Sequence, residues 1–132
     1  MNTPLQIAAF YVALNAIVTL ALAINAATTR GKTKIFLGDG GNEAMLRAVR
    51  AHGNNIEYVP LILVMLVTLA LMQGSILFLH IIGICLFLGR IAHGVGLATK
   101  SGASPGRGIG MLLTLIAMVI AIVMLLMKAL TF

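Results

Sequence analysis

Long stretches without a charged side chain restrict the fold of this sequence more than any other feature. The first charged residue is Arg30, and no Asp, Glu, Lys or Arg occurs from Tyr58 to Gly89. Charged residues make up 9% of the chain, whereas a soluble domain has about 25%. A helix crosses the hydrocarbon core of a bilayer with about 20 apolar residues. The stretches therefore predict membrane-spanning helices, with the lipid bilayer as the surrounding medium.

Polar and glycine-rich segments divide the chain into four expected spans. Residues 30–41 form a basic loop, Gln73-Gly74-Ser75 marks a tight turn, and residues 99–108 are rich in Gly, Pro and Ser. The uncharged run at 58–89 is too long for one span and too short for two. Its helices must therefore extend into the polar segments on both sides. We predict an all-α integral membrane four-helix bundle, a single domain over 1–132 with helices at approximately 4–28, 42–72, 75–98 and 108–128.

The distribution of Lys and Arg predicts the orientation in the membrane. The N-terminus and the Gln73 turn carry none, and only Lys128 lies near the C-terminus. Cytoplasmic loops carry an excess of Lys and Arg, so both basic loops should be cytoplasmic and both termini outside. The first helix lacks the positively charged start of a signal peptide and should be retained. The basic residues that set this orientation are Arg30, Lys32, Lys34, Arg47, Arg50, Lys100 and Arg107.

The charge balance and the cysteine content exclude several classes of protein. The net charge is +6, but the basic residues form no face with interleaved aromatics and the chain has no Trp, so we expect no nucleic-acid partner. The single cysteine, Cys85, excludes an internal disulfide and a thiolate metal cluster. We predict no metal site and interpret Cys85 as a buried inert thiol. His80, in the outer half of the third helix, should form a helix–helix hydrogen bond.

The second expected helix carries a polar stripe. At 100° per residue its members fall on one face, with Tyr58 at the edge. A solvated entry turn would explain a stripe that stops near Arg50, but this one continues toward the apolar run. At helical spacing, Glu43 should pair with Arg47, and Asn54 should pair with Glu57. The stripe consists of Glu43, Arg47, Arg50, Asn54 and Glu57.

Counting from the tight turn predicts which side chains share a depth. Glu57 and Arg90 lie equally far from the turn, and so do Asn54 and His93, several Å inside the cytoplasmic edge of the hydrocarbon. Ionisable groups at such depth are costly unless they are paired or face a wet cavity. Two interpretations follow: a structural Glu57–Arg90 pair, or a ligand site open to the cytoplasm. The additional polar groups at adjoining depths favour the ligand site: Arg47, Arg50, Asn54 and His93.

At these residues the sequence resembles the MAPEG family, the membrane-associated proteins in eicosanoid and glutathione metabolism. The matching segment reads Arg47-Ala-Val-Arg50-Ala-His52-Gly-Asn54-Asn-Ile-Glu57-Tyr58-Val-Pro60. The four-span architecture, the length and Arg90 in the second half of the third helix also match, so the resemblance covers nearly the whole chain. Gly38-Asp-Gly-Gly41, followed by Arg-Ala-His-Gly-Asn-Asn-Ile-Glu-Tyr at residues 50–58, looks most like the small bacterial branch of the family.

The resemblance implies a homotrimer in a bacterial inner membrane, with glutathione bound between neighbouring subunits at the cytoplasmic end. Family members use the glutathione thiol to conjugate, reduce or isomerise lipophilic substrates. Arginine guanidinium groups can bind the two carboxylates of glutathione through paired hydrogen bonds. Glu57 can bind its ammonium group, and Asn54 can donate or accept hydrogen bonds. The residues that carry over are Arg30, Arg50, Asn54, Glu57 and Tyr58, and their positions add Arg47 and Arg90 as candidate cofactor-binding residues.

The sequence departs from the family at the reactive end. The tyrosines that family enzymes place late in the third helix are replaced by His93 and Leu97. His93 could bond a thiolate or cap a polar interface. The thiol-activating arginine near the start of the fourth helix has Arg107 as its candidate, in a Gly-rich loop. A nearby cation lowers the pKa of a thiol, so His93 and Arg107 are the candidate catalytic residues.

The first functional hypothesis is a glutathione-dependent membrane transferase or peroxidase that acts on lipophilic electrophiles. A non-catalytic binding or scaffold protein of the same architecture is the alternative. A small multidrug transporter is the third class, but such proteins usually need a carboxylate within a span. The first helix has none, and the arginines beside Glu57 should keep that residue ionised.

Overall fold

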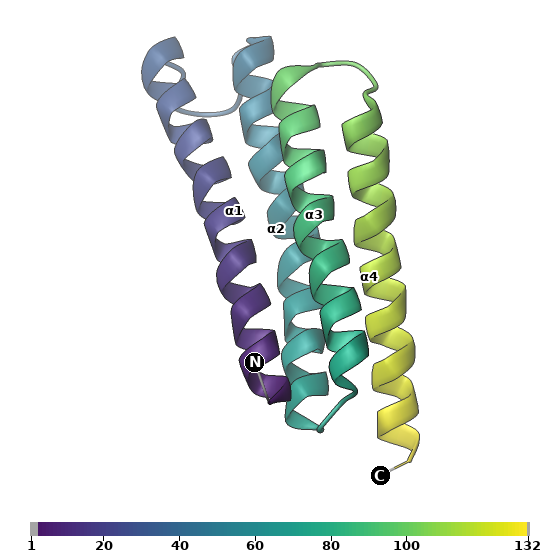
Figure 1. Cartoon of the computed structure of the whole chain (residues 1–132). Coiled ribbons are helices and arrows are strands. Elements are labelled where there is room, and N and C mark those ends of the chain that lie inside the picture. Colours follow the sequence, from purple (N-terminus) through teal and green to yellow (C-terminus); the bar gives the residue numbers. More distant parts are fainter. Residues whose placement is uncertain (1–2, 132) are drawn as a thin grey trace.

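The computed structural model describes residues 3–131, which form four antiparallel helices (Figure 1). All four are long and apolar enough to cross a membrane. The prediction of an all-α four-helix membrane bundle is confirmed. Both ends of the chain lie at the same end of the bundle as the turn at residues 72–75, and the two longer loops lie at the other end (Figure 1). The helices are α1 (Pro4–Thr33), α2 (Glu43–Leu71), α3 (Ile76–Thr99) and α4 (Pro105–Leu130).

Capping residues fix where the helices begin, and they explain where the helices differ from the expected bounds. Asn42 accepts a hydrogen bond from the backbone N–H of Met45 at the start of α2. Ser104 caps α4 and Pro105 occupies its first turn, so this helix begins three residues earlier than expected. α1 continues to Thr33, past the expected end at residue 28. Glycines at positive φ form the α1–α2 loop: Gly38, Gly40 and Gly41.

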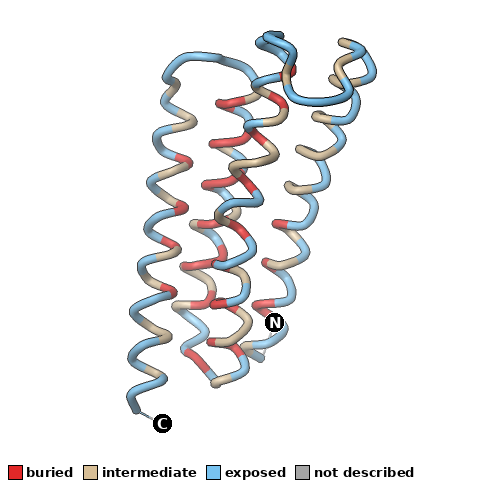
Figure 2. Tube along the Cα trace, turned by 180° about the vertical axis from the view of Figure 1, so that it is seen from behind, coloured by how far each residue is buried: buried red, intermediate tan, exposed pale blue. Residues whose placement is uncertain are grey.

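The helices α2 and α3 form the centre of the bundle, and α1 and α4 flank them. α1 contacts α2 and α3, and α4 contacts α3 and α2, but no contact joins α1 to α4 among the described residues. Figure 2 shows the buried positions on the faces between helices, while the outward faces are exposed. Large apolar side chains such as Ile17, Val64 and Leu112 cover those outward faces. This distribution suits contact with lipid chains rather than water.

Small residues allow α4 to pack closely on α3. The buried positions of α4 are Gly110, Thr114, Ala117 and Ala121. A Cβ added at Gly110 would lie 2.5 Å from the backbone oxygen of Gly89 in α3. Small residues at such spacing let membrane helices approach each other and gain van der Waals contact. The close packing holds α4 against the wall of the site described below.

Hydrogen bonds between polar side chains join neighbouring helices inside the spans. The Tyr11 hydroxyl and His80 Nδ1 lie 3.0 Å apart and join α1 to α3, which confirms the helix–helix hydrogen bond expected for His80. The amide of Asn55 donates to the hydroxyl of Thr19 at 2.8 Å and joins α2 to α1. Cys85 is half-buried beside the apolar core. These contacts stabilise the bundle and lie outside the polar stripe.

Candidate functional site

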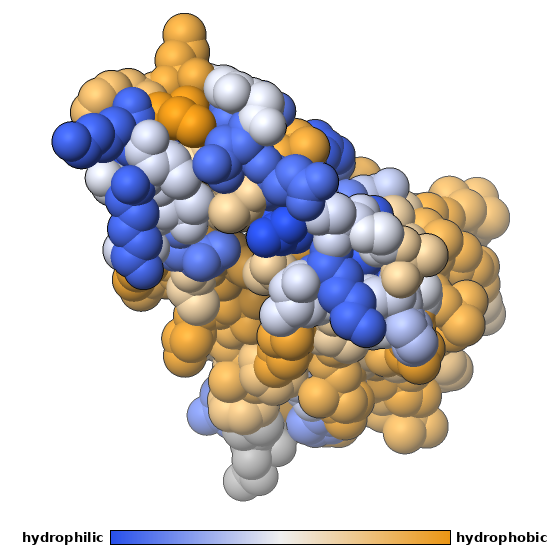
Figure 3. Space-filling view, turned by 90° about the horizontal axis from the view of Figure 1, so that it is seen from above, coloured by the Kyte–Doolittle hydropathy of each residue, from blue (hydrophilic) through white to orange (hydrophobic). Residues whose placement is uncertain are grey.

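A polar pocket of about 290 Å³ lies among α2, α3, the α3–α4 loop and the first turn of α4. It is at the end of the bundle that carries the two longer loops, which we call the basic end. Viewed onto this end, a band of hydrophilic side chains crosses the bundle, with apolar side chains around it (Figure 3). The volume is at the lower limit of about 300–1,000 Å³ for small-molecule sites. The lining residues are Glu43, Leu46, Arg47, Arg50, Asn54, His93, Leu97, Ser101 and Arg107.

The polar stripe of α2 forms one wall of the pocket, as the helical spacing predicts. Arg50 Nη1 donates to Glu57 Oε1 at 3.3 Å, and Asn54 Nδ2 donates to Glu57 Oε2 at 3.5 Å. The predicted Asn54–Glu57 contact is therefore present. Glu57 itself does not line the pocket but holds two residues that do. Its carboxylate thus sets the position of both an arginine and an amide on this wall.

Arg90 supports the pocket from within the bundle. Its side chain is only 1% exposed, and Nη1 donates to Asn54 Oδ1 at 3.1 Å and to the Asn54 backbone oxygen at 3.4 Å. Its guanidinium carbon lies 6.0 Å from the centre of the Tyr58 ring. Because Asn54 Oδ1 accepts from Arg90, the Asn54 amide nitrogen is turned to Glu57. Arg90 is therefore a positioning residue for Asn54 rather than part of the pocket lining.

The Glu57–Arg90 ion pair that one interpretation predicts is wrong. Residues 3–131 contain salt bridges at Arg47–Glu43 and Arg50–Glu57, and none between Glu57 and Arg90. Counting residues from the turn places the backbones of Glu57 and Arg90 at similar depths in α2 and α3. It does not predict how far along the bundle the Arg90 side chain extends. The long Arg90 side chain reaches Asn54, one helical turn nearer the basic end, and Glu57 takes the closer Arg50. Nε and Nη2 of Arg90 have no hydrogen-bond partner within the described chain.

The α3–α4 loop closes the pocket through contacts with the start of α2. Ser101 Oγ donates to Glu43 Oε2 at 3.0 Å, and Arg47 Nη1 donates to Ser101 Oγ at 2.8 Å. The predicted Glu43–Arg47 pair is also present, at 3.4 Å. Sequence reasoning did not single out Ser101, because a serine in a Gly/Pro/Ser loop carries no distinguishing signal. These contacts hold the loop beside the arginine side chains of α2.

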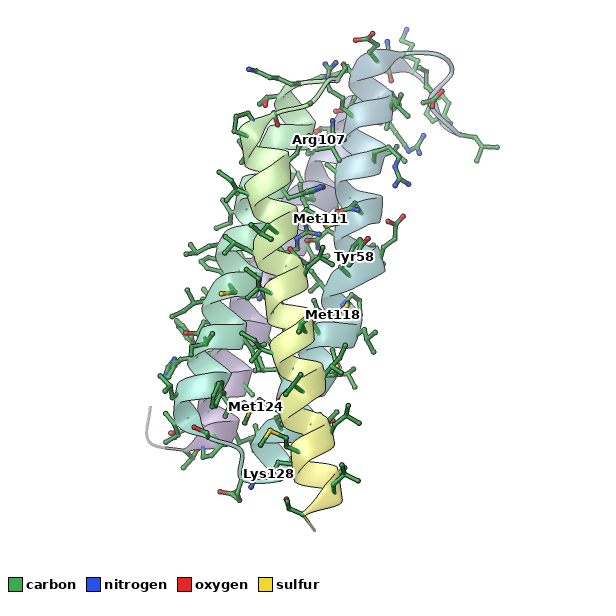
Figure 4. The ribbon with its side chains drawn as sticks, turned by 90° about the vertical axis from the view of Figure 1, so that its right-hand side faces the viewer. Tyr58, Arg107, Met111, Met118, Met124 and Lys128 are labelled. Carbon is green, nitrogen blue, oxygen red and sulfur yellow. The ribbon has the colours of Figure 1, made fainter. Side chains whose placement is uncertain are left out.

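Arg107 and His93 form the opposite wall. Arg107 lies in the first turn of α4 and not in a loop as predicted, because Ser104 and Pro105 start the helix before it. Its Nη1 donates to the backbone oxygen of Gly102 at 2.7 Å. His93, from α3, is buried and lines the same pocket. Figure 4 shows Arg107 toward the basic end, and Tyr58 of α2 deeper in the bundle.

Besides Glu57 and Arg90, two more candidate residues lie outside the pocket. Arg30 is on α1, which contributes no lining residue, and its Nη1 donates to the backbone oxygens of Ile35 and Gly38 at 3.0 and 3.1 Å. Tyr58 lies beside Arg90 instead. Within a single chain the structure therefore brings together five of the candidate site residues: Arg47, Arg50, Asn54, His93 and Arg107.

The pocket is suited to an anionic ligand that has several hydrogen-bonding groups. Arg47, Arg50 and Arg107 contribute three guanidinium groups, against the single lining carboxylate of Glu43. Guanidinium groups bind carboxylates through paired, charge-assisted hydrogen bonds. No cluster of three or more His, Cys, Asp or Glu side chains that could hold a metal occurs in residues 3–131. The three guanidinium groups therefore favour recognition of carboxylates.

The fold and the pocket define a four-span membrane protein with an arginine-rich polar site at one end. The model of the MAPEG family matches residues 8–127, and the chain belongs to this family. Two curated relatives, the inner membrane protein YecN of two Escherichia coli strains, are each 30% identical over 91 residues. That match covers 69% of this chain and 70% of each relative. No solved structure gives a significant match.

Proposed function

We propose that the pocket binds glutathione and that the protein is a glutathione-dependent transferase or peroxidase for lipophilic electrophiles. One observation carries this proposal: three arginines, an asparagine and a histidine converge on one pocket in a chain of the MAPEG family. Glutathione offers two carboxylates, an ammonium group, two amides and a thiol. The pocket supplies cations for the carboxylates and polar donors for the amides, and it lies at the end of apolar spans that a lipophilic substrate can approach from the bilayer.

The residues have distinct expected roles. Arg50 and Arg47 bind the carboxylates, Asn54 bonds an amide or carboxyl group, and Glu57 receives the ammonium group. His93 and Arg107 lie on the opposite wall, where a cation and an imidazole favour the thiolate form of the thiol. In conjugation, the thiolate sulfur forms a bond to an electrophilic carbon, the leaving group departs with its electron pair, and the thiol proton passes to solvent. Glutathione and the electrophile supply all the atoms of this reaction.

The assembly and orientation are part of the proposal. The lysine and arginine distribution supports a cytoplasmic basic end, and the relatives named as inner membrane proteins support a bacterial inner membrane. A homotrimer with glutathione between subunits would give Arg30 a role, because this residue lies away from the pocket of its own chain. Tyr58 would likewise contribute through the subunit interface or through its contact with Arg90.

Calorimetry with glutathione tests the site. Losing a hydrogen bond to a charged group costs about 1.5–3 kcal/mol, so Arg50→Ala and Glu57→Gln should each weaken binding by about tenfold or more. Lys100→Ala is the matched control, because Lys100 is an exposed basic residue at the same end that does not line the pocket. Unchanged binding in both pocket variants would overturn the site assignment.

Turnover separates an enzyme from a binding or scaffold protein. The replacement of the family tyrosines by His93 and Leu97 keeps the non-catalytic alternative in view. Conjugation of a chlorinated aromatic substrate should proceed with the protein in detergent and should fall in the His93→Ala variant. Binding of glutathione without turnover at any pH would establish the scaffold instead. A thermal shift with glutathione but not with its S-methyl analogue would show that the free thiol is recognised.

A further inference from the structure

The loop between α1 and α2 folds back along the bundle. Lys34 has a positive φ of 56° and reverses the chain at the end of α1. Arg30, one turn before that end, then donates to the backbone oxygens of Ile35 and Gly38. In Figure 1 the loop lies below the ends of both helices that it joins. Arg30 thus fixes residues 35–38 at the height of the last turn of α1.

This loop exposes two large apolar side chains. Phe36 is 83% exposed and Leu37 is 92% exposed, whereas Ile35 is tucked against Gly40. Exposed apolar residues on the helices face the lipid chains, but a loop beyond the spans needs another explanation. Adjacent exposed Phe and Leu side chains on a protein surface mark an interaction site. An apolar contact from outside the chain would bury them.

The height of the loop and its charge indicate what that contact is. The uncharged part of α1 ends at Arg30, so this level is the boundary between lipid chains and headgroups. Lys32 and Lys34 closely precede the apolar pair in the sequence, and both are exposed. The one acid of the loop, Asp39, is engaged by the backbone N–H of Gly41 at 2.9 Å. Two exposed apolar side chains, with two nearby lysines that form no ion pair within residues 3–131, match an anionic lipid surface.

We propose that residues 32–38 form a membrane-anchoring site for anionic phospholipids. Phe36 and Leu37 insert between headgroups, and Lys32 and Lys34 contact the phosphates. Each lysine near an anionic surface favours the docked loop by about fivefold. None of residues 32–38 lines the polar pocket, and the proposal does not depend on the function proposed for that pocket. Arg30 has a structural role here, because it shapes the loop that presents the apolar pair.

Tryptophan fluorescence tests this proposal directly, because the chain has no Trp. Phe36→Trp places a single probe in the loop, and Ala103→Trp places a control probe in the exposed loop between α3 and α4 at the same end. Both variants are reconstituted in nanodiscs of phosphatidylglycerol and phosphatidylcholine, with and without bromine on the acyl chains near the headgroup. We expect bromine to quench the Phe36→Trp emission strongly and to leave the Ala103→Trp emission nearly unchanged.

The lipid class is tested in the same system. Replacing phosphatidylglycerol by phosphatidylcholine, or adding Lys32→Gln and Lys34→Gln to the Phe36→Trp protein, should reduce the quenching. Emission that is blue-shifted but unaffected by bromine would place the loop against a second copy of the chain and overturn the proposal. Equal quenching of both probes would overturn it as well. If the quenching stays the same when phosphatidylglycerol or the two lysines are replaced, the proposed recognition of anionic headgroups is wrong.

Discussion

Replacing Gly110 by alanine should separate α4 from α3 at the level of the pocket. The added Cβ would lie 2.5 Å from both the Gly89 backbone oxygen and the His93 backbone nitrogen, and 2.7 Å from the His93 Cβ. Backbone atoms of a packed helix cannot turn away as a flexible side chain can, so α4 must retreat by roughly 1 Å to restore ordinary contact. Overpacking of this kind costs about 1–3 kcal/mol.

Gly108→Ala is the matched control for this prediction. Gly108 lies on the same helix, and a Cβ there would meet nothing within 4 Å. Exchange of glycine for alanine inside a helix favours folding by about 0.5–1 kcal/mol in both variants. The difference between their free energies of unfolding therefore measures the steric clash alone. For a chain of this size, the melting temperatures in detergent should differ by about 4–12 °C. Equal melting temperatures would refute the close α3–α4 packing.

The two variants should also differ in ligand binding, because His93 and Arg107 lie on the two helices that would separate. A displacement of about 1 Å is enough to weaken a preorganised site substantially. We expect Gly110→Ala to lower glutathione affinity and Gly108→Ala to leave it close to that of the unmodified protein. Retained affinity in a destabilised Gly110→Ala protein would show that the α4 wall contributes little to binding.

Three further substitutions test buried polar groups and the packing around them. Arg90→Met should raise the free energy of unfolding by about 1–4 kcal/mol, because it removes a buried charge whose Nε and Nη2 atoms have no hydrogen-bond partner within residues 3–131. It should also weaken glutathione binding, because Asn54 loses its partner. Thermal unfolding measures the first effect and calorimetry the second. Tyr11→Phe should cost about 0.6–1.7 kcal/mol through the lost bond to His80. Gly83→Ala should cost more, since a Cβ there would overlap the Tyr11 ring. The reverse order in thermal unfolding would contradict this packing.

The spans and the polar stripe could be predicted because they rest on simple periodicities. Uncharged runs of sufficient length mark helices in a bilayer, and the 100° step places Arg50, Asn54 and Glu57 on one face of α2. The same step predicts the Glu43–Arg47 pair, which the structure contains. These inferences need only local geometry, so they do not depend on how the helices pack.

Contacts between helices were harder to predict from the sequence. Counting residues from the tight turn compares only backbone positions. The Arg90 side chain extends a full helical turn along the bundle and bonds Asn54 instead. The placement of Arg107 was wrong although a signal was present: serine followed by proline is a helix start. The small residues of α4 likewise recur at helical spacing, with Gly110 and Thr114 among them. Their role becomes visible only when the backbone of Gly89 is seen beside them.

The contacts of Glu57 explain how one wall of the pocket could both hold its shape and accept a charged ligand. The Arg50 and Glu57 side chains are 54% and 49% exposed, so their mutual attraction is worth only about 0–1 kcal/mol after screening by water. A ligand carboxylate can therefore take Arg50 at little cost and leave Glu57 for the ammonium group. Asn54 cannot be displaced so easily, because the buried Arg90 holds its oxygen. The wall thus combines one fixed hydrogen-bonding group with one exchangeable ion pair, which favours a ligand that carries both signs of charge over a simple anion.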